Sequence, residues 1–287
     1  MMNTMFERNA NSKSFSINYG LIFSYIILFL GAVTMVVPFL WMISTSLKVP
    51  SEVFVFPPKW IPKPITFNNY INVLTKTPFG LFFLNTLKIT IFVTIGRLIT
   101  CSMGAYAFSR LKFPGRDALF ILYLSTMMIP YQVTIIPTFI LMRYLKLIDT
   151  LYSLILTGAT SAFGTFLLRQ FFMTLPVELE EAAIIDGANK WTIFTKIILP
   201  LSRSALLTLV IFTVLGTWND FLGPLIFLQS QKNFTLTIGL SLFKGVHETE
   251  WTLLMAASLL SILPIILIFI IAQKYFIEGI ALSGLKE

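Results

Sequence analysis

The chain has 287 residues, of which 56% are hydrophobic and 12% are charged, and its mean hydropathy is +0.83. A soluble domain carries about twice that share of charged residues, so the composition excludes a mainly soluble protein. The net charge of +8 is explained by Lys and Arg residues that flank membrane spans and face anionic lipid. We therefore expect no nucleic acid as a partner. The single Cys101 excludes an internal disulfide, and the single His247 leaves no His/Cys cluster for a metal.

The apolar runs predict an all-α, polytopic membrane protein with six transmembrane helices. The first run follows a polar segment, 1–18; it is too long for the core of a signal peptide, and no small-residue cleavage site follows it. We therefore expect it to remain as a span. In chain order the predicted spans cover about 19–43, 82–108, 118–136, 151–168, 204–228 and 251–276. A tail, 277–287, ends the chain, and an even number of spans puts both termini on one side.

Three further features lie between or within these spans. Residues 45–80 form a long polar and aromatic loop that is rich in proline. Residues 137–150 combine apolar positions at helical spacing with two basic residues, which predicts a helix lying in the membrane interface. In the fourth span small residues recur on one helical face and predict close packing against other helices; they are Gly158, Ser161, Ala162 and Thr165.

The distribution of basic residues predicts the orientation. If both termini are cytoplasmic, the segments that face the cytoplasm contain more Lys and Arg residues than the segments that face outward. The bias is clearest in the short loop 109–117, which contains Arg110, Lys112 and Arg116, because short loops follow the positive-inside rule best. We therefore expect 1–18 and 277–287 to be cytoplasmic, in a multi-pass protein of a bacterial-type cell membrane.

An acidic stretch, "ELEEAAIIDGANKWTIFTKIILP" at 178–200, lies between the fourth and fifth spans. Three glutamates near its start favour a helix N-terminus, and Gly187 can adopt the left-handed conformation that ends a helix. A second helix is expected over 190–198, ending near Pro200. Leu179, Ala182 and Ala183 share one face of the first helix. These residues alone are compatible with a connector or with a docking element.

The spacing of this stretch resembles the EAA loop of permease subunits of binding-protein-dependent ABC importers. Glu181-Ala182-Ala183 is followed after three residues by Gly187, and later by Ile197 and Leu199-Pro200. The resemblance implies the type I importer permease fold, a six-span domain over 19–276 and a cytoplasmic coupling loop over 170–203. It also implies that a short helix inserts into a cytoplasmic ATPase, through residues that include Glu181, Ala182, Ala183, Asp186 and Gly187.

Other stretches are similar to the carbohydrate-uptake branch of this family. They are "AYAFSRLKFPGR", "TWNDFLGPLIFL", "TLTIGLSLF" and the last apolar run, and the absence of a large outer domain resembles the smaller maltose-permease-type subunit. The resemblance implies a subunit that forms half of a pathway for a sugar or sugar derivative. The implied partners are a cytoplasmic ATPase dimer, a sister permease, an extracellular binding protein and membrane lipid. ATP and Mg would bind the ATPase, and this chain would hold no catalytic residue, cofactor or metal.

The fifth predicted span contains the candidate substrate contacts. Trp218, Asn219 and Asp220 interrupt its apolar run; a tryptophan ring stacks on sugars, and the two polar side chains can bond to hydroxyl groups. The alternative is that the polar pair only bonds to other helices or to the sister subunit. Arg97, inside the second span, has no counterpart in the family pattern. It would pack against a carboxylate such as Asp220 or against backbone carbonyl groups.

The role of one segment and two rival functions stay open at this point. By resemblance, residues 229–250 reach toward the binding protein, and the alternative is an ordinary connection between spans. An ion-coupled secondary transporter would require several intramembrane carboxylates and often an internal repeat. A membrane-embedded enzyme would require a catalytic cluster of His, Asp or Ser residues, for which one histidine is a poor basis.

Overall fold

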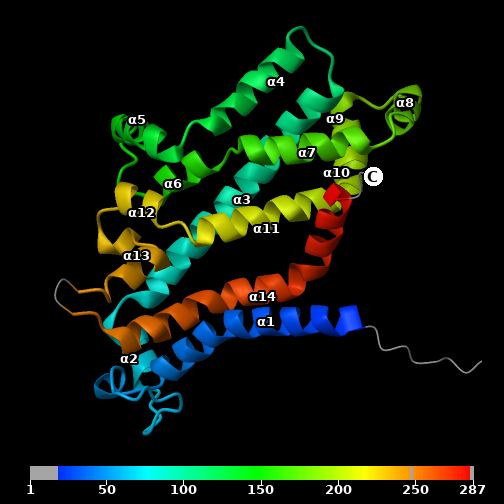
Figure 1. The fold of residues 1–287 in the computed structure, drawn as a ribbon. Coiled ribbons are helices and arrows are strands. Elements are labelled where there is room, and N and C mark those ends of the chain that lie inside the picture. The colour runs from blue at the N-terminus through cyan, green and yellow to red at the C-terminus, as the bar shows by residue number, and fades with distance from the viewer. Residues whose placement is uncertain (1–18, 246–247, 285–287) are drawn as a thin grey trace, which may run out of the picture.

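The computed structural model describes residues 19–245 and 248–284, which form a bundle of helices without a β-strand (Figure 1). The predicted segment 1–18, the last three residues of the predicted tail and His247 lie outside the described residues. The longer helices are α1 (Tyr19–Ser46), α2 (Asn68–Lys76), α3 (Phe79–Arg110), α4 (Arg116–Ser125), α5 (Tyr131–Tyr144), α6 (Leu151–Gly158), α7 (Ala162–Thr174), α8 (Glu178–Ile185), α11 (Arg203–Trp218) and α14 (Trp251–Gly284).

Shorter helical pieces connect these elements. They are η1 (Pro50–Glu52), η2 (Thr126–Met128), α9 (Lys190–Ile193), the π-helix η3 (Phe194–Ile198), α10 (Leu199–Leu201), α12 (Leu222–Phe227), η4 (Gln231–Asn233) and α13 (Leu236–Ser241). Four segments are long and apolar enough to cross a membrane: 23–46, 79–110, 151–174 and 251–271. Two bent helix pairs, 116–144 and 190–218, raise the number to six if each is one span.

The third span is bent, which the sequence did not predict. The helical stretches Arg116–Met128 and Tyr131–Tyr144 meet at 99°. Pro130 disfavours helical geometry at the residue before it, and Ile129 is extended, with φ −85° and ψ 115°. The interface helix predicted at 137–150 therefore begins earlier, at Tyr131, and ends at Tyr144. Residues 116–128 alone cover about 20 Å, against about 30 Å of membrane hydrocarbon.

The fourth span is broken between α6 and α7, and its small residues pack as predicted. A Cβ atom added to Gly158 would lie 2.9 Å from a methyl group of Val93 in α3. One added to Gly104 of α3 would lie 3.3 Å from the methyl group of Thr165. Small side chains thus allow α3 to approach α6 and α7 closely.

The ends of the last two predicted spans also differ from expectation. The predicted helix 204–228 is interrupted after Trp218, where the chain turns before α12. The last helix continues past 276 to Gly284, through most of the predicted tail. Both differences have the same origin, because an apolar run marks what lies in lipid and not where a helix begins or ends.

α3 is the central helix, since it contributes to each of the three buried clusters in the described part of the chain. One cluster joins it to α7 and α9–α11, a second to α2, α11, α13 and α14, and a third to α5, α6, α12 and α13. The N-terminal end of α1 and the C-terminal end of α14 point to the side on which α8 lies, while α2, α12 and α13 lie at the opposite end (Figure 1).

Candidate functional site

The acidic segment forms the predicted helix, glycine turn and second helix at one end of the bundle. Gly187 ends α8 with a φ of +81°. Its N–H donates to the carbonyl of Ile184 (3.0 Å), and the N–H of Ala188 donates to the carbonyl of Ala183 (2.8 Å). This pair of bonds is the Schellman arrangement, which satisfies carbonyl groups that the helix leaves unpaired. Asn189 then caps the second helix by accepting from the N–H of Thr192 at 2.8 Å.

A buried ion pair attaches α8 to the rest of the protein. The Nε of Arg110, at the end of α3, lies 3.0 Å from Oε1 of Glu180, and both side chains are less than a tenth exposed. Nη2 of the same arginine donates to the carbonyls of Phe172 (2.5 Å) and Leu175 (2.6 Å). Arg110 therefore joins three elements, α3, the end of α7 and α8. The sequence did not suggest this role, because Arg110 and Glu180 are far apart in the chain.

The candidate coupling residues do not all face the same way. Glu181, Ala182, Asp186 and Gly187 are exposed, but Ala183 is half-buried and packs against the cluster that joins α3 to α7 and α9–α11. Of the two alanines of the predicted docking face, Ala182 is thus exposed, and Ala183 lies on the same side of the helix as the buried Glu180. The outer face instead presents Ile185, which is 86% exposed, beside Ala182 and two glutamates.

The three polar or aromatic residues of the fifth span have separate environments. Trp218 is 3% exposed, packs edge-on against Phe83 and donates from its Nε1 to the carbonyl of Ser261 in α14 at 3.0 Å. Its position in the core corrects the expectation of a free stacking face. Asn219 is exposed, and its side-chain amide donates to the carbonyl of Leu215 at 2.9 Å.

Asp220 organises the break between α11 and α12. Its Oδ1 accepts from the N–H of Gly223 at 3.2 Å, near the start of α12. Its backbone carbonyl accepts from the hydroxyl of Thr237 in α13 at 2.6 Å. Within this chain, the Asp220 side chain thus bonds to the start of α12, and its backbone carbonyl bonds to α13.

α11 has two exposed faces on opposite sides. Phe212, Gly216 and Asn219 recur at helical spacing and form one open face, and a Cβ atom added to Gly216 would have no atom within 4 Å. At 100° per residue, Leu207 and Val210 lie on the other side of the helix. The first face, with a side-chain amide and an aromatic ring, has the chemistry that suits a polyhydroxylated solute.

Arg97 bonds to the break in the fourth span. Its Nε donates to the carbonyl of Gly158 at 2.7 Å, and the hydroxyl of Thr100 donates to the carbonyl of Ala159 at 2.7 Å. Both carbonyls belong to the last turn of α6 and have lost their helical partners. Arg97 therefore bonds to a backbone carbonyl group and not to a carboxylate such as Asp220. Such a contact is favourable because unpaired backbone groups are costly in lipid.

Asp149 ties two loops together, a role that the sequence did not suggest. Its Oδ1 accepts from the N–H groups of Gln229 (2.9 Å) and Ser230 (2.8 Å), and Oδ2 accepts from the hydroxyl of Ser230. Asn233 donates to the same carboxylate at 3.1 Å. Partial burial opposes ionisation, but these hydrogen bonds outweigh it and hold the pKa of Asp149 well below its usual value. The loop before α6 is thereby fixed to the loop after α12.

The described residues contain no group of three or more His, Cys, Asp or Glu side chains placed to hold a metal ion.

Residues 98–281 match the family described as "Binding-protein-dependent transport system inner membrane component".

Curated relatives cover most of the chain. The arabinooligosaccharides transport system permease protein AraQ of Halalkalibacterium halodurans is 37% identical over 78% of this chain and 81% of that protein. The sn-glycerol-3-phosphate transport system permease protein UgpE of Yersinia pestis is 34% identical over 90% of this chain and 95% of its own length.

Two solved structures have similar folds. One chain of a bacterial ABC transporter involved in the import of the acidic polysaccharide alginate superposes with a TM-score of 0.83 and 27% identity, over 96% of this chain and 100% of that one. A chain of an alginate ABC transporter in complex with its pentasaccharide-bound periplasmic protein has a TM-score of 0.67 over 88% of this chain and 91% of that one. At 14% identity, the second similarity concerns the fold alone.

Proposed function

Because this chain belongs to the family of binding-protein-dependent inner-membrane permeases, it is the transmembrane subunit of an ABC importer, and we propose that it carries a sugar or sugar derivative together with a sister permease. It is a permease and not an enzyme, and ATP hydrolysis in ABC importers takes place on a separate subunit. The relatives named for arabinooligosaccharides, sn-glycerol-3-phosphate and alginate share polyhydroxylated solutes. This shared chemistry supports the substrate class.

The observation that carries the coupling role is the outer face of α8. The buried pair of Arg110 and Glu180 fixes the helix to α3, while Ile185 projects from it with 86% of its surface exposed. An exposed isoleucine beside glutamates has the chemistry of a contact with a soluble partner. We propose that this face, with Glu181, Ala182, Asp186 and Gly187, contacts the cytoplasmic ATPase dimer.

The open face of α11 is the proposed substrate pathway. Asn219 contributes an amide for hydroxyl groups, and Phe212 contributes an apolar ring. Asp220 shapes the break at which α11 ends, and Trp218 supports it from within the core. The sister permease, which we propose to be a different chain, would close the pathway from the other side.

The proposed orientation has both termini and α8 in the cytoplasm, and residues 229–250 facing the extracellular binding protein. Reporter fusions at Gly115 and Lys190 should then report the cytoplasm, and fusions at Lys59 and Lys244 the outside. An outside signal at Lys190 would contradict both the orientation and the coupling role.

Co-purification tests the coupling face directly. Ile185→Ser removes the most exposed apolar side chain of α8 and should release the ATPase from the purified complex or make its hydrolysis independent of the loaded binding protein. Val177→Ser is the matched control, since Val177 is 51% exposed but precedes the helix. If both variants keep a stimulated ATPase, the assignment of this face is wrong.

A second experiment identifies the substrate. It is the solute that raises the melting temperature of the cognate binding protein and is then taken up.

A further inference from the structure

An apolar groove opens on the side of the protein away from the proposed pathway. It has a volume of about 570 Å³ and lies between α3, α9–α10 and α11. Its walls include Ile99 and Met103 of α3, Trp191 of α9 and Leu207 of α11, and Arg203 is the only charged side chain that lines it. None of the coupling or pathway residues described above belongs to it.

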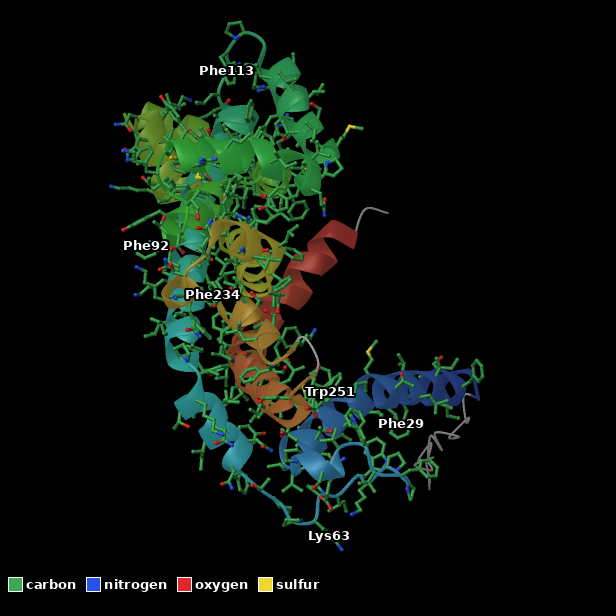
Figure 2. All side chains as sticks on the ribbon, turned by 90° about the vertical axis from the view of Figure 1, so that its left-hand side faces the viewer. Phe29, Lys63, Phe92, Phe113, Phe234 and Trp251 are labelled. Carbon is green, nitrogen blue, oxygen red and sulfur yellow. The ribbon has the colours of Figure 1, made fainter. Side chains whose placement is uncertain are left out.

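The direction in which the groove faces follows from helix geometry. Leu207 lies on the side of α11 opposite to Phe212 and Gly216, which face the proposed pathway. On α3, Ile99 is seven residues from Phe92 and therefore shares its face. Figure 2 places Phe92 at the edge of the molecule opposite to α1 and its Phe29. The groove thus opens away from the concave side from which α1 projects.

The depth of the groove in the membrane follows from its position in the chain. Arg203 is the first residue of α11 and directly follows the segment that contains α8 to α10, so it lies at the inner end of the span in the proposed orientation. From there the groove extends along α11 to Val210, about 10 Å, which is a large part of the roughly 15 Å of hydrocarbon in one leaflet. Trp191 is 61% exposed at the same end.

This combination matches a phospholipid. An arginine and a tryptophan at the level of the headgroups, above an apolar channel, are the side chains that anchor proteins at the membrane interface. We propose that the groove holds one acyl chain of an inner-leaflet phospholipid and that Arg203 binds its anionic headgroup. Trp191 and Phe194 belong to the segment that follows α8, so the lipid would also join this segment to α3.

Fluorescence quenching tests the site in the assembled transporter. The complete complex is placed in nanodiscs that contain either phosphatidylglycerol or phosphatidylcholine with brominated acyl chains. The loss of tryptophan fluorescence is measured in the parent and in Trp191→Phe, and the difference between the two losses is the quenching of Trp191. We expect half-maximal quenching at about fivefold lower mole fraction of phosphatidylglycerol than of phosphatidylcholine, the preference that one basic side chain near the surface supplies. This measurement does not depend on transport, so its result is separate from the proposed function.

Three variants separate the headgroup from the acyl chain. Arg203→Gln should remove the preference for phosphatidylglycerol, Arg203→Lys should retain it, and Leu207→Phe should weaken quenching by both lipids because it fills the groove. Arg143→Gln, at the exposed end of α5, is the control and should change nothing. Equal quenching by both lipids in the parent would overturn the anionic site. Absence of quenching of Trp191 by either lipid would overturn it as well, because a helix of the sister permease would then cover the groove.

Discussion

Replacing Gly187 by valine tests the coupling segment at its most sensitive point. The residue has a φ of +81°, and a Cβ atom added to it would meet no atom within 4 Å, so the effect of Gly187→Val comes from the backbone and not from a clash. A β-branched residue in this region is strained by about 1–3 kcal/mol. The two hydrogen bonds of the turn, at 2.8 and 3.0 Å, stabilise it by about 1 kcal/mol each. The backbone strain and the stabilisation by the two hydrogen bonds are therefore of similar size, so the turn should relax and tilt α8.

A strain of about 2 kcal/mol changes the population of the native turn about 30-fold. Transport in proteoliposomes should accordingly fall at least tenfold, while the protein remains inserted in the membrane. The ATPase should either be lost during purification or hydrolyse ATP without responding to the loaded binding protein. Both are measured on the reconstituted complex, by solute uptake and by phosphate release.

Gly115→Val is a matched control for this strain. Gly115 has a φ of +77° and also has no atom within 4 Å of an added Cβ, but it lies in the loop before α4. Its replacement should lower thermal stability by a similar amount and leave transport within about twofold of the parent. If Gly187→Val transports as well as Gly115→Val and keeps its ATPase, the coupling role of the segment is refuted.

Other side chains give further predictions. Glu180→Ala leaves the charge of Arg110 buried without its carboxylate partner, which costs about 3 kcal/mol, and limited proteolysis should then cleave the α8 segment much faster than in the parent. The low pKa of Asp149 means that its contribution to stability is complete above the unfolded value of about 3.9 and is lost as the pH falls toward the folded value. The melting temperature of Asp149→Asn should thus lie below that of the parent at pH 7, and the gap should narrow below about pH 4. Asn219→Ala should impair uptake in an assembled complex, whereas loss of assembly would indicate that Asn219 only supports the structure.

The sequence was sufficient where local chemistry decides the structure. The apolar runs located the helices that are long enough to span a membrane. Gly187 adopts the expected left-handed turn, since a residue without a Cβ atom enters this conformation at no steric cost. The small residues of the fourth span meet α3 because nothing larger would fit.

The remainder depends on partners that are distant in the chain, which periodicity cannot reveal. Glu180 looks like any helix-starting glutamate until Arg110 is placed beside it. With Glu180 buried, the helix is rotated so that Ala183 faces inward and Ile185 outward. In the same way, the break after Gly158 lies inside one predicted span, and the donors that stabilise it come from Arg97 and Thr100 of α3.

α3 connects the two ends at which an importer must act. At its C-terminal end Arg110 bonds to the end of α7 and pairs with Glu180 of α8. Near its N-terminal end Asn85 donates to the carbonyls of Lys232 (2.9 Å) and Phe234 (3.0 Å), in the loop that follows α12. Between these points α3 is one uninterrupted helix of 32 residues, whereas the third, fourth and fifth spans are bent or broken. If the proposed coupling role is correct, a displacement of α8 by the ATPase would reach the loop bound by Asn85 through a single rigid element, and the broken spans around α3 would be the places where the proposed pathway changes shape.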